Sequence, residues 1–228
     1  NIAAKYQALS SVKYLSRTFI QFDTSATSDL MTNINSGYIP NPLSSSTVSS
    51  YLKLFNVFHS ERRATGFNID IHPLTSAWDE GNGIGFNESN ELLVSGAASY
   101  VERKPRVAWV VSGGDYIIDS NSATQYFPTG DENLSINVTN MLNNWLSGVS
   151  SNNGFILKMD SISESKTGST SASEDLYRKS FFGRETFSLK WPRLEFVWTG
   201  DRITDHRNLL SFGNSGYSAQ VQSCFFNM

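Results

Sequence analysis

The sequence predicts an all-β protein: an antiparallel, jelly-roll-like β-sandwich with one or two short helices and long loops. Its strand-like segments are short, rich in aromatic and β-branched residues, and separated by turns of Gly, Ser and Asn. Charged residues make up only 17% of the chain, so Ser, Thr and Asn supply most of its polarity, as suits strands and turns. A doubly wound α/β fold would need several helices between its strands, and the sequence offers too few.

The first strands are predicted from composition. Tyr14–Asp23 and Tyr51–Phe58 are rich in aromatic and aliphatic residues, and each is expected to form a strand. Ser36–Ser50, which lies between them, holds two prolines and a serine cluster and is predicted to be a loop.

Residues 66–73 carry the clearest strand pattern, because apolar and polar side chains alternate as in a strand with one buried face. The expected inward set is Phe67, Ile69 and Ile71, and the expected outward set is Asn68, Asp70 and His72. His72 is therefore predicted to be solvated. Pro73–Phe86 follows as one helical turn that a glycine-rich loop ends.

Residues 87–130 show the least regular pattern. Val107–Gly114 is a candidate buried strand, and the Gly, Ser and Asn around it predict long connections. Connections of that length often carry function or a partner surface.

Regular patterns return in the second half of the chain. Residues 134–138 alternate as a strand, and residues 139–148 then show helical spacing, with Thr139 as the expected cap and Gly148 as the expected end. The remaining predictions are a strand at 154–159, a polar loop at 161–176 and a hairpin at 181–198.

The predicted domain organisation has two parts. Residues 1–200 form the sandwich domain, with an insertion or long loops at about 84–130. Residues 201–228 form a C-terminal extension that contacts a neighbour or a following domain, because Phe225 and Phe226 place an aromatic pair near a polar end. Since the chain begins at Asn1, we expect it to be a piece of a longer protein.

Composition excludes several classes of function. The net charge of −3 gives no basic field that would attract nucleic acid. The single cysteine, Cys224, excludes an internal disulfide and a cysteine-based zinc site. No apolar run approaches the roughly 20 residues of a membrane span, so no membrane association is predicted.

The sequence predicts no catalytic residues and no cofactor. It contains no GxSxG, HExxH, GxGxxG or P-loop motif. The carboxylates in "WDEGNG" and those of Glu185 and Glu195 do not form an evident pair flanking a cleft, which a glycosidase would need.

The sequence also offers candidate residues for a calcium site and for a glycan contact. Asp79, Glu80 and Asn82 offer oxygen ligands for calcium, but the spacing is not that of an EF-hand, and a turn whose acids cap backbone amides is favoured. Trp109 and Trp191 are the better candidates for exposed rings that contact a glycan, whereas Trp78 and Trp145 are expected in the core.

An ion pair is predicted between terminal strands. The strand period places Glu185 on the same face as Phe181 and Phe187, so its carboxylate needs a buried cation. Arg17 is the first candidate, and Arg193 is the alternative. This pair is expected to be structural rather than catalytic.

Three blocks of sequence together resemble a known family. They are "LSRTFIQFD" followed by "YLKLFN", then "IDIHPLTSAWDEGNG", and then "INVTNMLNNWLSGVSSNNGFILKMD" leading to "FFGRETFSLKWPRLEFVW". This order resembles the DNRLRE-type β-sandwich domain, which is similar to carbohydrate-binding modules. The "FFGRET" and "PRLEF" endings are similar to the version in virion structural proteins of marine tailed phages.

The resemblance implies a non-enzymatic structural component of a tailed-phage virion, in a fibre, the baseplate or the capsid. Its expected location is the virion, its expected partners are other virion proteins and further copies of itself, and a host surface glycan is a candidate ligand. The alternative is a carbohydrate-binding module of a secreted or surface bacterial protein.

Overall fold

Antiparallel strand pairing organises the part of the chain that the computed structural model describes, which is residues 2–7, 12–58, 65–81, 96–165, 177–184, 189–200 and 220–227. Every strand pair in these residues is antiparallel, and three short helices accompany the strands. The all-β prediction is therefore confirmed, and the architecture is consistent with a β-sandwich. The finer jelly-roll description stays a prediction.

The chain divides into two compact units, each assembled from segments that are separate in sequence. Unit 1 consists of Asn1–Gln21, Asn56–Glu132 and Ser151–Phe181. Unit 2 consists of Phe22–Phe55, Asn133–Ser150 and Phe182–Met228. The predicted single domain over residues 1–200 is thus divided in a way that no composition change along the sequence indicates.

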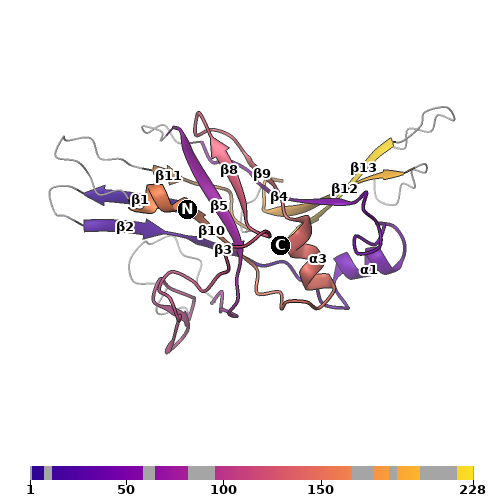
Figure 1. Cartoon of the computed structure of the whole chain (residues 1–228), viewed down its shortest axis with the longest axis horizontal. Helices are drawn as coiled ribbons and strands as arrows, with labels where there is room; N and C mark the ends of the chain where they lie inside the picture. The colour runs from indigo at the N-terminus through magenta and orange to yellow at the C-terminus, as the bar shows by residue number, and fades with distance from the viewer. Residues whose placement is uncertain are drawn as a thin grey trace. The chain divides into compact units, whose positions relative to one another are not determined.

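Unit 1 is built on a four-stranded sheet. Its order is β3 (Thr18–Ile20), β10 (Phe155–Met159), β5 (Phe67–Pro73) and β8 (Ala123–Phe127). Figure 1 shows β5 and β8 side by side, as their register from Phe67↔Phe127 to Ile71↔Ala123 requires. All five residues of β10 are buried, because this strand lies at the centre of the core.

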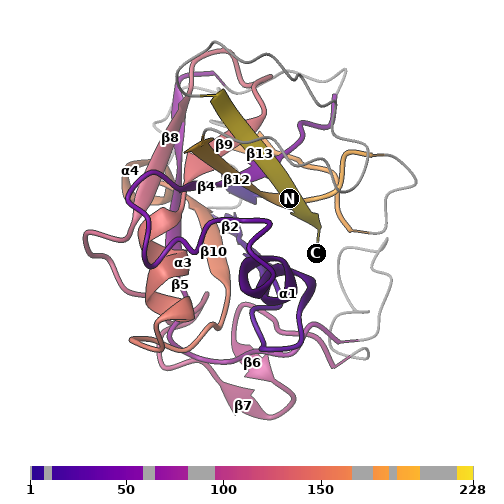
Figure 2. The same ribbon diagram turned by 90° about the vertical axis from the view of Figure 1, so that its right-hand side faces the viewer.

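Smaller elements complete unit 1. A second sheet has the order β11 (Tyr177–Lys179), β1 (Ile2–Gln7) and β2 (Val12–Ser16). The short strands β6 (Glu102–Lys104) and β7 (Val107–Ala108) pair in a separate hairpin, visible in Figure 2. Helix α4 (Ser161–Ser165) follows β10 directly.

Unit 2 holds the other four-stranded sheet and two helices. The strand order is β13 (Gln220–Asn227), β12 (Arg193–Gly200), β4 (Ser49–Leu54) and β9 (Leu134–Asn137). The helices are α1 (Asp29–Asn35) and α3 (Thr139–Leu146). Alternate residues of β4 and of β9 are buried. For β9 this confirms the period-two pattern that predicted the strand, whereas β4 was predicted from composition.

Several predicted elements need correction. The predicted strand over Tyr14–Asp23 is divided at Arg17 into β2 and β3. Val107–Gly114 is not a buried strand, because only Val107–Ala108 pairs and both residues are exposed. The polar loop predicted at 161–176 begins with α4, and residues 166–176 lie outside the described part of the chain.

Helix α3 confirms the helical spacing but not the predicted cap. Val138 occupies the cap position without a side-chain hydrogen bond, and Asn137 Oδ1 instead accepts from Thr139 N at 3.0 Å. Thr139 Oγ1 accepts from Ser50 N at 2.8 Å, so this hydroxyl joins α3 to β4. Gly148 does follow the helix end, with φ of 74°.

The C-terminal extension also differs from the prediction. Residues 220–227 are not outside the sheets, because β13 pairs with β12 from Gln220↔Gly200 to Asn227↔Arg193. Backbone pairing of this kind needs no alternating apolar pattern, which explains why the sequence did not reveal it. Residues 201–219 lie outside the described part, and a contact with a neighbour stays a prediction. Among the described helices, none is long and apolar enough to cross a membrane.

Candidate functional site

The largest group of buried charges in the described residues surrounds Arg17, at the break between β2 and β3. Its guanidinium donates from Nε to Glu164 Oε1 at 3.0 Å and from Nη2 to Glu164 Oε2 at 2.8 Å. The remaining nitrogen, Nη1, donates to the carbonyl of Gly113 at 2.9 Å. Both charged side chains are only 10% exposed. Two parallel hydrogen bonds of this kind are the strongest form of an arginine–carboxylate pair.

A second cation joins the same carboxylate. Lys158 on β10 is 4% exposed, and its Nζ lies 3.4 Å from Glu164 Oε2 while donating to the carbonyl of Met159 at 2.7 Å. One buried carboxylate therefore faces two buried cations. Burial lowers the pKa of Arg17, but the hydrogen bond and the charge of Glu164 outweigh it, so the pKa is raised and the guanidinium stays charged.

Two tyrosines, Tyr100 and Tyr116, lie beside these charged side chains. We call the five residues the Arg17 cluster: Arg17, Tyr100, Tyr116, Lys158 and Glu164. The Arg17 Cζ atom lies 5.5 Å from the ring centroid of Tyr100 and 5.9 Å from that of Tyr116. Burial raises the pKa of the Tyr116 hydroxyl, although the charge of Arg17 opposes the shift. Tyr116 is therefore neutral at physiological pH.

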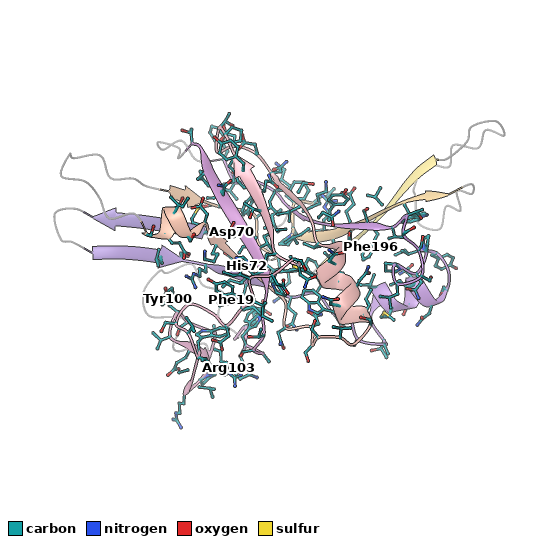
Figure 3. All side chains as sticks on the ribbon, in the orientation of Figure 1. Phe19, Asp70, His72, Tyr100, Arg103 and Phe196 are labelled. Carbon is teal, nitrogen blue, oxygen red and sulfur yellow. The ribbon has the colours of Figure 1, made fainter. Side chains whose placement is uncertain are left out.

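His72 is buried beside this cluster, which corrects the prediction of a solvated side chain. It is 4% exposed, its Nδ1 lies 2.8 Å from Ser122 Oγ, and its ring stacks on Tyr116 at 4.8 Å. Figure 3 shows His72 on the same strand as Asp70, whose carboxylate accepts from Thr124 at 2.7 Å. Alternation along β5 placed His72 correctly on the polar face but did not reveal that Tyr116 covers it.

The loop at Gly113 is fixed from two directions. Arg17 binds the carbonyl of Gly113, and a Cβ added at that glycine would lie 2.5 Å from Arg17 Nη1. Asp115 accepts from Val110 N at 3.2 Å, from Val111 N at 2.8 Å and from Ser76 Oγ at 2.9 Å. Burial raises the pKa of Asp115, but these hydrogen bonds outweigh it and the pKa is lowered.

The carboxylates of this region are engaged within the chain. Both oxygens of Glu164 contact buried cations. Asp115 is committed to backbone amides in the same way. The described residues contain no group of three His, Cys, Asp or Glu side chains that could hold a metal ion.

The predicted glycan contacts have different outcomes. Trp109 is 5% exposed, packs on Phe19 at 5.2 Å and donates from Nε1 to the carbonyl of Ser99 at 2.9 Å. Its ring is a core element, so the prediction of an exposed platform was wrong. The pattern "VAWVV" did not show which of its apolar residues points inward. Trp191 is half-buried, and its contact with a glycan stays a prediction.

Of the three candidate calcium ligands, Asp79 already contacts other residues of the chain. Asp79 Oδ1 lies 2.9 Å from Lys104 Nζ, and the backbone of Asp79 pairs with Arg103 and Ala98. Glu80 is exposed, and Asn82 lies outside the described residues.

Glu185, the predicted partner of Arg17, also lies outside the described residues. The carboxylate that the structure places on Arg17 is that of Glu164. The alternative cation, Arg193, lies over the ring of Phe55 at 4.5 Å. Glu195 pairs with Lys53 at 2.9 Å on the neighbouring strand β4. An Arg17 ion pair was foreseen, but Glu164 was not, because residues 161–176 have no apolar pattern that indicates burial.

The fold and the Arg17 cluster define an all-β protein in which buried charged side chains bind one another and the backbone of a loop. No family model, curated protein or solved structure matches this chain.

Proposed function

We propose that this chain is a non-enzymatic structural component of a tailed-phage virion, as a fibre, baseplate or capsid-associated domain. The sequence blocks described above suggest the virion. The structural observation that supports an assembly role is a group of exposed aliphatic side chains on and beside the β6–β7 hairpin.

This group, which we call the valine ridge, consists of Val101, Val107, Val110 and Val111. Val110 is 89% exposed, Val111 is 63% exposed and Val101 is 60% exposed. Hydrogen bonds bring the segments together, since Trp109 N donates to the carbonyl of Val101. Exposed aliphatic groups that gather on one loop are typical of a surface that contacts another protein.

The ridge is pre-organised for contact. Asp115 fixes the backbone amides of Val110 and Val111, and Trp109 anchors the intervening chain in the core of unit 1. A loop that is already fixed loses little conformational entropy on binding, which favours stable assembly. The buried charges, by contrast, are engaged with each other and give no support to a catalytic role.

The virion proposal is tested with antibody raised against this chain. Labelling of intact purified particles, together with detection of the chain in their protein content, is the expected result. Absence of the chain from the particles would overturn the proposal.

The assembly role is tested by Val110→Asp with Val111→Asp. This double variant should lose incorporation into particles in a complementation assay while keeping its melting temperature. Val149→Asp is the matched control, because Val149 is 75% exposed but lies in unit 2 and outside the ridge. Normal incorporation of the double variant would exclude the ridge as an assembly surface.

The alternative proposal, a carbohydrate-binding module, lost support when Trp109 proved to be buried. Trp191 is the remaining candidate platform. Binding to a glycan array that Trp191→Ala abolishes would favour this alternative over the virion proposal.

A further inference from the structure

Lys179 is the one lysine among the large side chains that are less than 2% exposed in the described residues. It ends β11, and its Nζ donates to Asn56 Oδ1 at 2.8 Å and to the carbonyl of Gly130 at 2.7 Å. Both acceptors are uncharged. The buried amine of Lys179 is therefore in direct contact with the carboxamide of Asn56, which is half-buried.

Aromatic rings enclose the same amine. Nζ lies 5.1 Å from the ring centroid of Phe127 and 5.3 Å from that of Phe181. The ring of Phe127 itself stacks on Phe67 at 5.3 Å. The rings limit the access of water, which would compete with the amine as a nucleophile.

The backbone holds the two side chains on adjacent segments. Asn56 forms an antiparallel bridge with Phe181, and Val57 N donates to the carbonyl of Ser180 at 3.0 Å. Lys179 lies two residues from Phe181, so the strand period places it on the same face as that residue. Amine and carboxamide are thus positioned by strand pairing and not by a chance contact of long side chains.

A carboxylate, that of Glu132, accepts a hydrogen bond from the backbone of Gly130, whose carbonyl accepts from Lys179. Glu132 Oε1 accepts from Thr129 N at 2.9 Å and from Thr129 Oγ1 at 2.7 Å, whereas Oε2 is buried without a hydrogen-bond partner. Burial raises the pKa of Glu132, but the hydrogen bonds from Thr129 and from the Gly130 backbone outweigh it, so the pKa is lowered. Glu132 is therefore ionised at neutral pH, and Oε2 is its oxygen without a hydrogen-bond partner.

We propose that Lys179 and Asn56 form an intramolecular isopeptide bond, with Glu132 as the group that transfers the proton. The proposal concerns a modification site and is independent of the virion proposal.

The reaction balances without an oxidant or a further reactant. The Lys179 ammonium gives one proton to Glu132, and the resulting amine attacks Cγ of Asn56 after the Asn56 side chain has rotated to bring Cγ in front of Nζ. The Nζ–Cγ bond forms, Nζ gives up its second proton, and the Cγ–Nδ2 bond breaks. The proton held by Glu132 and the second proton from Nζ both pass to Nδ2, which leaves as ammonium. Glu132 is regenerated.

The bond would link residues that are 123 positions apart in the sequence. A covalent link of this length restricts the unfolded chain strongly and so stabilises the folded state. With one cysteine in the chain, an internal disulfide cannot supply such a link.

The proposal is tested by intact-mass spectrometry of the purified full chain under denaturing conditions. The wild type should be lighter than its sequence mass by one ammonia, and proteolysis should yield a branched peptide that joins Lys179 to Asn56. An unchanged mass after prolonged incubation of the folded protein would overturn the proposal, because Lys179 would then be a buried hydrogen-bond donor without a covalent link.

Three variants locate the reaction. Lys179→Arg and Glu132→Gln should keep the full sequence mass, and each should have a lower melting temperature than the linked wild type. Lys158→Arg is the matched control, because Lys158 is also buried but binds Glu164, and it should lose ammonia as the wild type does. Ammonia loss in Lys179→Arg would refute the assignment. Wild-type ammonia loss in Glu132→Gln would refute the role of Glu132.

Discussion

At the scale of single residues, the Arg17 cluster is unusual because one carboxylate serves two buried cations. Removing a partner from a buried ion pair commonly costs about 3–5 kcal/mol, since the remaining charge is left without compensation. The three side chains are not equivalent in this respect. Loss of Glu164 leaves both Arg17 and Lys158 uncompensated, whereas loss of Arg17 leaves Glu164 still bound to Lys158.

We therefore predict that Glu164→Met destabilises the protein more than Arg17→Met does. Arg17→Met should lower the free energy of unfolding by about 3 kcal/mol, and the double variant should lose less than the sum of the two changes. Urea denaturation of the four proteins of this cycle measures the coupling. The more exposed pair Lys53–Glu195 is the control and should couple by only about 0–1 kcal/mol. Additive losses at Arg17 and Glu164 would contradict the cluster.

His72 should make stability depend on pH. Burial lowers its pKa below the ordinary value of 6.5, with Lys158 and Arg17 adding to the shift and Asp70 opposing it. The unfolded chain therefore binds a proton at a higher pH than the folded chain. The stabilising contribution is complete above pH 6.5 and is lost as the pH falls from there through the lower pKa of the folded state.

Denaturation between neutral and mildly acidic pH tests this prediction. The wild type should lose stability as the pH falls below 6.5. The His72→Gln variant should lose less stability over the same fall in pH. Asp115 and Asp160 do not confuse the comparison, because their pKa values are lowered from 3.8 and they titrate at more acidic pH. Equal slopes for wild type and variant would contradict a buried neutral His72.

At the scale of elements, the C-terminal strand is where the structure departs furthest from the sequence-based prediction. β13 pairs with β12 over eight residues and forms one edge of the unit 2 sheet. A net contribution of about 1 kcal/mol for each backbone hydrogen bond makes this pairing a substantial part of the stability of unit 2. An extension that packs outside the sheets would contribute little.

We predict that removal of residues 220–228 lowers the free energy of unfolding by more than about 3 kcal/mol, because several hydrogen bonds of the ladder are lost. Chemical denaturation of the truncated chain provides the measurement. Removal of Met228 alone is the control and should have little effect, because β13 ends at Asn227. A truncated chain as stable as the wild type would show that β13 contributes nothing to the sheet.

At the scale of the whole molecule, local patterns predicted the strands better than their arrangement. Period-two alternation was enough for β5, because Phe67, Ile69 and Ile71 are all buried. The same pattern failed for His72 and Trp109, whose burial depends on Tyr116 and Phe19 from other parts of the chain. Glu164 and Lys179 were missed for the same reason, since a buried charge is recognisable only when its partners are known.

The division into two units could not be predicted from the sequence either, because the chain passes from one unit to the other without linkers. The boundaries fall after Gln21, Phe55, Glu132, Ser150 and Phe181, which makes five crossings. At the two boundaries after Phe55 and after Phe181, Asn56 bridges Phe181 within unit 1, and Phe182 N donates to the carbonyl of Phe55 within unit 2.

We predict a single cooperative unfolding transition for both units. Ile69→Ala in unit 1 and Phe196→Ala in unit 2 each remove a side chain that is 0% exposed, and each should cost about 2–5 kcal/mol. In scanning calorimetry both variants should lower the midpoint of the same single peak, with equal calorimetric and van't Hoff enthalpies. If the units unfolded independently, each substitution would shift one of two peaks and leave the other in place. The chain passes from one unit to the other five times, and this covalent continuity is the reason for expecting one transition.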